Sequence, residues 1–232
     1  RITTAKVKPR SVHFDCYEID PVLNSYLRDT LSEADIQCRH AQINASSKLY
    51  EDDFILSHKF GLQTDIFDTN GNDNGGYTYA ILNPPYKKIN SGSPHRAALR
   101  KAGIETSNLY TGFVFLAAQR LRPGGEMVAI IPRSFCYGPY FKPFREQFFA
   151  MMSLCHIHIF EKRNHAFKDD AVLQENIIIH AVKGKKPPTV TITTSHGAAF
   201  EIDPDHQTCT AEDMTQRTVP YEAVIRANDP DK

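Results

Sequence analysis

Residues 77–86 read Tyr-Thr-Tyr-Ala-Ile-Leu-Asn-Pro-Pro-Tyr, and this stretch decides the fold. Its first six residues are aromatic, β-branched or aliphatic with one alanine, a composition that favours a buried β-strand. The two prolines after Asn83 lack the backbone N–H that a strand needs to extend its hydrogen-bond ladder. The stretch therefore predicts a strand whose carboxyl end passes directly into a rigid polar turn.

Strand-like and helix-like segments alternate on both sides of this stretch. The predicted strands cover residues 13–19, 35–39, 126–132, 155–160, 176–182 and 189–193, and the predicted helices begin at 20–21, 108 and 141. Asp20 is expected to cap the first helix, because its carboxylate can accept hydrogen bonds from free N–H groups of the first turn. This alternation predicts an open α/β sheet, in which ligands bind beyond the carboxyl ends of the strands.

The composition restricts the classes of function. The 232 residues are 41% hydrophobic, enough for a sizeable core, and carry 27 basic and 27 acidic side chains. Any surface that binds a polyanion must therefore be a local concentration of positive charge. The five cysteines are scattered and form no C-x-x-C pair, which indicates neither a disulfide framework nor a zinc site. Without an apolar run of membrane-spanning length, the sequence predicts a soluble protein of the cytoplasm.

The run Asn83-Pro84-Pro85-Tyr86 carries the strongest chemical signal. An exocyclic base amine is a poor nucleophile because its lone pair is delocalised into the ring. Acceptors such as the Asn83 side-chain oxygen and the Pro84 carbonyl can bind the amine protons and free that lone pair. Tyr86 can stack on a base extruded from a duplex. The alternative is an ordinary strand-to-loop turn, but an apolar strand leading straight into the run favours the chemical interpretation.

The sequence YAILNPPYKKI resembles the catalytic motif of amino-directed DNA methyltransferases, above all the TaqI-like adenine-N6 group and the modification domains of fused restriction–modification enzymes. The resemblance extends over about residues 12–185. It implies a Rossmann-like α/β fold with a mixed, mostly parallel sheet. It also implies that S-adenosylmethionine donates a methyl group to a flipped adenine in double-stranded DNA, with Asn83, Pro84, Pro85 and Tyr86 as catalytic residues.

The same resemblance assigns residues to the methyl donor. Glu18 corresponds to the acidic residue that binds the donor's ribose hydroxyls, a role that suits a carboxylate. Asp65 corresponds to the residue that accepts a hydrogen bond from the donor's adenine amine, and Ile66 or, as the alternative, Phe67 flanks the adenine ring. Their alternatives are a surface acid for Glu18 and a cap for Asp65.

Further residues are assigned to DNA. Phe167 resembles the family's aromatic residue that stacks on the target base opposite Tyr86; its alternative is a small hydrophobic cluster. Lys87 and Lys88 begin a basic window, residues 87–101, that contains no acid and could contact phosphates or form a solvated loop. His156 and His158 alternate on a predicted strand without a third ligand nearby, so no metal site is predicted.

The glycine-rich loop that the family places before Glu18 is missing. The sequence therefore predicts a chain without the first strand of the family's sheet, with the missing segment and a target-recognition domain expected elsewhere in the natural protein. Residues 1–185 are interpreted as an N-terminally incomplete catalytic domain and residues 186–232 as an extension or the start of a target-recognition region. Two other functions stay open: methylation of protein glutamine or ribosomal RNA guanine-N2, and a non-catalytic nucleic-acid-binding module.

Overall fold

The computed structural model describes residues 2–57, 76–160, 175–184, 186–195, 201–202, 209–210 and 214–224. The predicted site residues Asp65, Ile66 and Phe167 lie outside these ranges, so their roles stay predictions. The chain divides into two compact units, Arg1–Lys59 and Phe60–Lys232. Each unit is described by itself.

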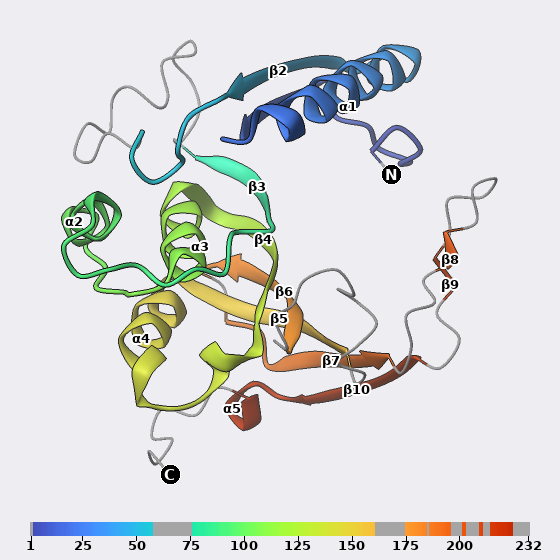
Figure 1. Ribbon diagram of the computed structural model, residues 1–232. Coiled ribbons are helices and arrows are strands. Elements are labelled where there is room, and N and C mark those ends of the chain that lie inside the picture. The colour runs from blue at the N-terminus through green and yellow to red at the C-terminus, as the bar shows by residue number, and fades with distance from the viewer. Residues whose placement is uncertain are drawn as a thin grey trace. The chain divides into compact units, whose positions relative to one another are not determined.

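The first unit is a strand–helix–strand element (Figure 1). Strand β1 (Ser11–Tyr17) and strand β2 (Asn44–Tyr50) pair in parallel and are connected by helix α1 (Pro21–His40). The Asp20 carboxylate accepts hydrogen bonds from the backbone N–H groups of Val22 and Leu23, at 2.8 and 3.3 Å. The predicted helix start is thus confirmed, together with its cap.

The predicted strand at residues 35–39 is wrong. These residues form the last turns of α1, where Arg39 and Asp35 make an ion pair one helical turn apart. The strand of this region is instead β2, which the sequence did not reveal. Its residues are largely polar and exposed, so they lack the alternation of apolar and polar side chains that marks a half-buried strand.

The second unit contains a six-stranded sheet of order β10-β7-β5-β6-β4-β3. Its strands are β3 (Tyr77–Leu82), β4 (Leu121–Pro132), β5 (Met152–Phe160), β6 (Asn176–Lys183), β7 (Thr189–Ser195) and β10 (Met214–Pro220). The pairs β3–β4 and β5–β7 are parallel, whereas β6 is antiparallel to β4 and β5, and β10 to β7. The sheet is mixed, as expected for the predicted fold. A separate short pair joins β8 (Glu201–Ile202) and β9 (Cys209–Thr210).

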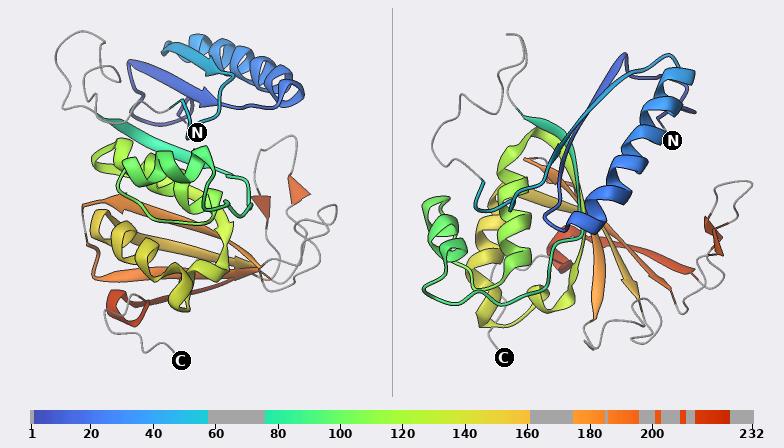
Figure 2. Two further views of the ribbon diagram at one scale, coloured as in Figure 1. Left: turned by 60° about the vertical axis from the view of Figure 1, so that its left-hand side comes forward. Right: turned by 45° about the horizontal axis from the view of Figure 1, so that its top comes forward.

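Helices cover one face of this sheet. Helices α3 (Leu109–Arg120) and α4 (Lys142–Met151) lie side by side on that face (Figure 2). Alternate residues of the central strands are buried: Met127, Ala129 and Ile131 on β4, and Ile177, Ile179 and Ala181 on β6. The unit also contains the helices and short 3-10 turns α2 (Pro94–Lys101), η1 (Arg133–Cys136), η2 (Pro139–Phe141) and α5 (Tyr221–Val224).

Strand β3 lies at an edge of the six-stranded sheet. Within the described ranges it pairs with β4 alone, and the β1–β2 pair forms a separate sheet. The side chains of Tyr79 and Ile81 are 67% and 87% exposed. The missing strand that the sequence predicts stays a prediction. Strands β7 and β10, from beyond residue 185, continue the sheet at its other end, so the domain division at 185 stays a prediction.

None of the helices in the described parts of the chain is long and apolar enough to cross a membrane.

Candidate functional site

The Asn-Pro-Pro-Tyr turn begins directly after β3, which ends at Leu82 as predicted. Asn83 is exposed, Pro84 is buried and Tyr86 is half-buried. The two prolines lack backbone N–H groups, so the hydrogen-bond ladder of β3 cannot continue through them. Pro84 is buried and packs the turn against the rest of the unit. The Asn83 amide therefore lies at the surface beyond a strand end, where a substrate can reach it.

The hydroxyl of Tyr86 ties this turn to the neighbouring strand. It donates a hydrogen bond to the backbone carbonyl of Ile130 on β4 at 3.0 Å. The same hydroxyl lies 3.5 Å from the Asn83 side-chain oxygen, at the limit of a hydrogen bond. The Tyr86 ring packs edge-on against Tyr110, with centroids 6.2 Å apart. The position of the Tyr86 ring is thus set by β4 and α3 together.

The chain leaving the turn is held to the start of α3 by backbone hydrogen bonds. The Ile89 N–H donates to the carbonyl of Ser107 at 2.7 Å, and the Leu109 N–H donates to the carbonyl of Lys87 at 2.9 Å. These two bonds form an antiparallel bridge between Lys88 and Asn108. The predicted catalytic turn is therefore fixed at its beginning by β3 and at its end by the first residues of α3.

A cavity of about 300 Å³ lies beside Tyr86. Its walls come from four aromatic residues and from shorter polar and apolar ones: Tyr86, Tyr110, Tyr140, Phe141, Lys88, Asn108, Pro132 and Ser134. This volume is at the lower end of the range of small-molecule sites, about 300–1,000 Å³. Burial raises the pKa of Tyr110 far above its usual value, only partly opposed by Ser134, so its phenol stays neutral. The lining suits a small planar, uncharged group.

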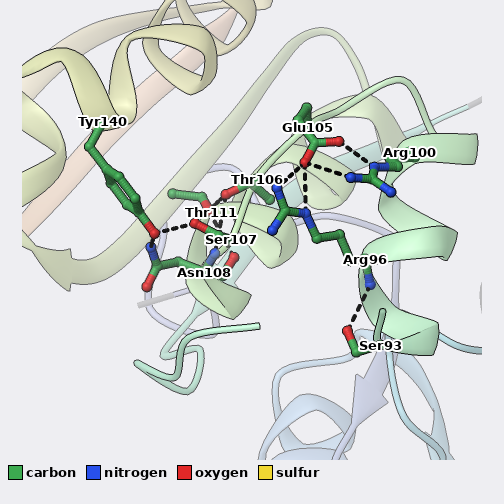
Figure 3. A network of polar contacts seen from close by, with 9 residues as sticks. All are labelled: Ser93, Arg96, Arg100, Glu105, Thr106, Ser107, Asn108, Thr111 and Tyr140. Carbon is green, nitrogen blue, oxygen red and sulfur yellow. Dashed lines mark hydrogen bonds and ion pairs between the residues drawn. The ribbon is translucent and has the colours of Figure 1, made fainter. Parts of the chain in front are cut away.

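A polar network lies at one wall of this cavity (Figure 3). The side-chain amide of Asn108 donates a hydrogen bond to the Tyr140 hydroxyl at 3.1 Å, and Ser107 bonds to the same hydroxyl. Thr106 and Thr111 share a buried hydrogen bond of 2.6 Å below them. The residues that lead into α3 are thereby joined to the 3-10 turn η2, which carries Tyr140.

Asn108 occupies the N-cap position of α3 but makes no side-chain cap. Asparagine at this position commonly stabilises a helix by about 1 kcal/mol through such a bond. Here Thr111 bonds to the Asn108 carbonyl at 2.9 Å and Thr106 accepts from its N–H at 3.3 Å. The Asn108 side-chain amide donates its hydrogen bond to the Tyr140 hydroxyl instead.

The basic window folds in part into helix α2, which the sequence did not predict. Ser93 caps this helix by accepting a hydrogen bond from the Arg96 N–H at 3.2 Å. Arg96 and Arg100 both form ion pairs with Glu105, an acid just beyond the window (Figure 3). Hydrogen bonds from Arg100 and Arg96 lower the pKa of Glu105. Two of the five basic residues are thus paired within the protein.

Lys87 and Lys88 remain exposed beside the turn. Lys88 also lines the cavity. The structure thus brings these two predicted DNA contacts next to Tyr86, whereas Arg96 and Arg100 form ion pairs with Glu105.

Glu18 lies in the first unit, just beyond the carboxyl end of β1. One of its carboxylate oxygens accepts a hydrogen bond from the Asp20 N–H at 2.8 Å. A carboxylate has about four lone-pair positions, so this bond holds the group in place and leaves acceptor capacity for a ligand's hydroxyls. Asp20 itself caps α1, as the sequence predicted.

His156 and His158 lie on β5 and contact hydroxyl groups of β7. Both side chains bond to Thr193, at 2.8 and 2.9 Å, and His158 also bonds to Ser195 at 3.1 Å. Burial lowers the pKa of both histidines, and the nearest imidazole adds to the effect: His180 for His156, and His156 for His158. Their contacts are those of residues that join two strands.

Three residues near the turn were not identified from the sequence: Asn108, Tyr110 and Tyr140. The sequence placed Asn108 and Tyr110 only in the predicted helix that begins at residue 108 and corresponds to α3. Tyr140 carried no signal, because it lies 32 positions after Asn108 and only folding brings the two side chains into contact.

Comparisons with known proteins show the family to which the chain belongs. Residues 16–167 match the family model described as Eco57I restriction-modification methylase. The chain is 41% identical over 222 residues to the type II methyltransferase M.PstI of Providencia stuartii, covering 96% of this chain and 41% of that protein. It is 43% identical over 215 residues to M.BsuBI of Bacillus subtilis, covering 93% and 40%. The chain thus spans about two fifths of the length of these relatives.

Solved structures show the same fold at low identity. The type IIG restriction endonuclease BpuSI is 14% identical with a TM-score of 0.62, over 96% of this chain and 29% of that one. A putative class I S-adenosylmethionine-dependent methyltransferase from Listeria monocytogenes is 12% identical with a TM-score of 0.51, over 85% and 62%. The fold is Rossmann-like, and by its family match and its two relatives the chain belongs to the Eco57I restriction-modification methylase family.

Proposed function

We propose that the natural protein containing this chain is a DNA methyltransferase that transfers a methyl group from S-adenosylmethionine to the N6 amine of an adenine flipped out of double-stranded DNA. We propose that it acts within a restriction–modification system in the cytoplasm. One observation carries the proposal: an Asn-Pro-Pro-Tyr turn at a strand end presents an exposed Asn83 beside an aromatic cavity. The names of the two relatives, both type II methyltransferases, support it.

In the proposed mechanism the protein activates the amine. The Asn83 side-chain oxygen and the Pro84 carbonyl each accept a hydrogen bond from one amine proton. These bonds pull the nitrogen away from planarity, so that its lone pair becomes available. Tyr86 holds the base, because its own ring is fixed by the bond to Ile130 and by the packing against Tyr110. Fixed acceptors accelerate the step because they need no reorganisation when charge develops on the nitrogen.

Glu18 fits the methyl donor. Its carboxylate is half-buried at the end of a parallel strand and held by one backbone N–H, which is suitable for binding two ribose hydroxyls. We assign Asp65 and Ile66 to the donor's adenine and Phe167 to the target base, as the family resemblance implies. The donor supplies an electrophilic methyl group on sulfur.

The proposed product can be identified directly. The full-length protein is incubated with S-adenosylmethionine and plasmid DNA, and the DNA is digested to nucleosides for mass spectrometry. We expect N6-methyldeoxyadenosine. Appearance of N4-methyldeoxycytidine instead, or methyl transfer only to RNA or protein, contradicts the proposal.

Asn83→Ala tests the mechanism. We expect the rate of methyl transfer to fall at least about a hundredfold, because the reacting amine loses the Asn83 oxygen as a hydrogen-bond acceptor. Binding of S-adenosylmethionine, measured by calorimetry, and the thermal unfolding temperature should stay nearly unchanged, since Asn83 is exposed. Asn90→Ala, a change at another exposed asparagine seven residues on, is the matched control. Retained activity in Asn83→Ala removes this residue from the mechanism.

A further inference from the structure

Tyr140 presents an exposed aromatic ring at the cavity that Tyr86 lines. Its side chain is 56% exposed, although it belongs to the lining of the cavity. Tyr137, three residues earlier on the same segment, is 62% exposed but is not part of that lining. The two tyrosines share their exposure and differ in whether a ligand in the cavity could contact them.

The Tyr140 ring is held in place from two sides. At its polar end, Asn108 and Ser107 both bond to the hydroxyl (Figure 3). At its side, the Phe141 ring packs edge-on with centroids 4.7 Å apart. An exposed tyrosine without such contacts changes rotamer freely. This ring is therefore preorganised, although little of it is buried.

The anchor of this ring is itself buried. Asn108 is only 8% exposed, and its amide bonds to Tyr140 although its position at the N-terminus of α3 favours a helix cap. Thr106 and Thr111 bond to its backbone groups instead. The buried Asn108 amide holds the exposed Tyr140 ring in one orientation, and this arrangement is useful if a ligand packs against the ring.

We propose that Tyr140 contacts the substrate directly: its ring packs against the edge of the extruded base that Tyr86 holds. The proposal rests on the proposed function, because the base is the planar group for which the cavity is suited. In the proposed function Tyr86 stacks on a face of the base, and we assign the edge of the base to Tyr140, which lines the same cavity. Edge-to-face packing is a favoured geometry of aromatic rings.

The test compares three variants of the full-length protein: Tyr140→Phe, Tyr140→Ala and Tyr137→Ala. The substrate is a short duplex carrying the site that the wild type methylates, with 2-aminopurine in place of the target adenine for the fluorescence arm. We expect Tyr140→Ala to raise the KM for DNA about three- to tenfold and to reduce the 2-aminopurine signal, as loss of an aromatic contact predicts. Tyr140→Phe keeps the ring but removes the two bonds that orient it, so its KM should lie between those of the wild type and Tyr140→Ala. Tyr137→Ala should stay within about twofold of the wild type.

The outcomes separate this proposal from the proposed function. Wild-type protein that methylates no adenine overturns the proposed function. Wild-type activity together with an unchanged KM in Tyr140→Ala overturns the role of Tyr140 alone. A Tyr140→Phe variant as defective as Tyr140→Ala also overturns it, because the hydroxyl and not the ring would then be required. Calorimetric binding of S-adenosylmethionine confirms that each variant is folded.

Discussion

At the scale of single residues, the proposed chemistry depends on how Tyr86 and Asn83 are placed. The Tyr86 hydroxyl reaches across to the Ile130 carbonyl, 44 residues away in sequence, and so the turn cannot move without breaking a bond to β4. Asn83 remains exposed beside it. A buried Asn83 side chain could not reach a substrate, so its exposure is compatible with the proposed mechanism.

Tyr86 can be tested with two substitutions. Tyr86→Phe keeps the ring and removes the bond to Ile130, so we expect the free energy of unfolding to fall by about 1 kcal/mol. Base capture should weaken less than in Tyr86→Ala, because the packing against Tyr110 remains. Tyr86→Ala removes the ring as well and should weaken capture of the extruded base. Chemical denaturation gives the first quantity, and 2-aminopurine fluorescence in the target duplex gives the second. An unchanged fluorescence signal in Tyr86→Ala contradicts stacking.

At the scale of elements, the capping residues determine where α1 begins. Asp20 accepts two backbone N–H groups of the first turn, and Pro21 fits the first helical position. The same logic applies to α2, which Ser93 caps and Pro94 begins. The sequence analysis did not predict this second helix, although Ser93-Pro94 carries the same capping pattern as Asp20-Pro21.

Asp20→Ala should destabilise α1 by about 1 kcal/mol, the usual value of an N-cap. We expect faster hydrogen exchange at the Val22 and Leu23 amides, whose acceptor is lost, followed by mass spectrometry or NMR. Asp20→Asn keeps an acceptor oxygen and serves as the control. Equal exchange in the alanine variant and the wild type contradicts the capping role.

The β5–β7 pairing predicts a dependence of stability on pH. Burial holds the pKa of His156 and His158 below the ordinary value of 6.5, so the unfolded chain binds more protons than the folded chain as the pH falls. Their contribution to stability is complete above pH 6.5 and is lost below it. His180, hydrogen-bonded to Glu126 on β4 at 2.7 Å, is a further titratable group, and it adds to the lowering of the His156 pKa.

We therefore expect the free energy of unfolding to decrease between pH 7 and pH 5. The decrease should be smaller in a His156→Asn/His158→Asn variant, measured by urea denaturation at each pH. The comparison concerns slopes, because the substitutions also remove hydrogen bonds to Thr193 and Ser195. Identical slopes in the variant and the wild type count against the histidines as the source.

At the scale of the whole molecule, a net charge of zero requires local charge for DNA binding. Ion pairs with Glu105 occupy Arg96 and Arg100. Lys87 and Lys88, exposed beside the catalytic turn, are therefore the better candidates for phosphate contacts.

Lys87→Ala should weaken DNA binding by the full-length protein to a similar degree on any sequence. The slope of log K against log salt should fall by about 1, the loss of one phosphate contact. Arg96→Ala is the control and should change the slope much less. Fluorescence anisotropy across a salt series measures both. A slope unchanged in Lys87→Ala removes Lys87 from the interface.

Much of the fold was predictable from local patterns. The strand at residues 77–82 was predicted with its observed bounds, because its apolar residues and the prolines after it define both ends. The starts of helices α3 and α4 were predicted to within one residue. Strands β2 and β10 were missed, because their side chains are mostly exposed and carry no periodic apolar pattern.

The sequence by itself determined that a strand ends in Asn-Pro-Pro-Tyr, that Asp20 starts a helix, and that the chain resembles one family of methyltransferases. Only the tertiary structure decided that Asn108 and Tyr140 meet beside Tyr86, and that Glu105 pairs with two arginines of the basic window. The physical reason is that local sequence specifies which backbone bonds can form and which face is apolar. The partner that each side chain meets across the fold is chosen by packing between distant segments.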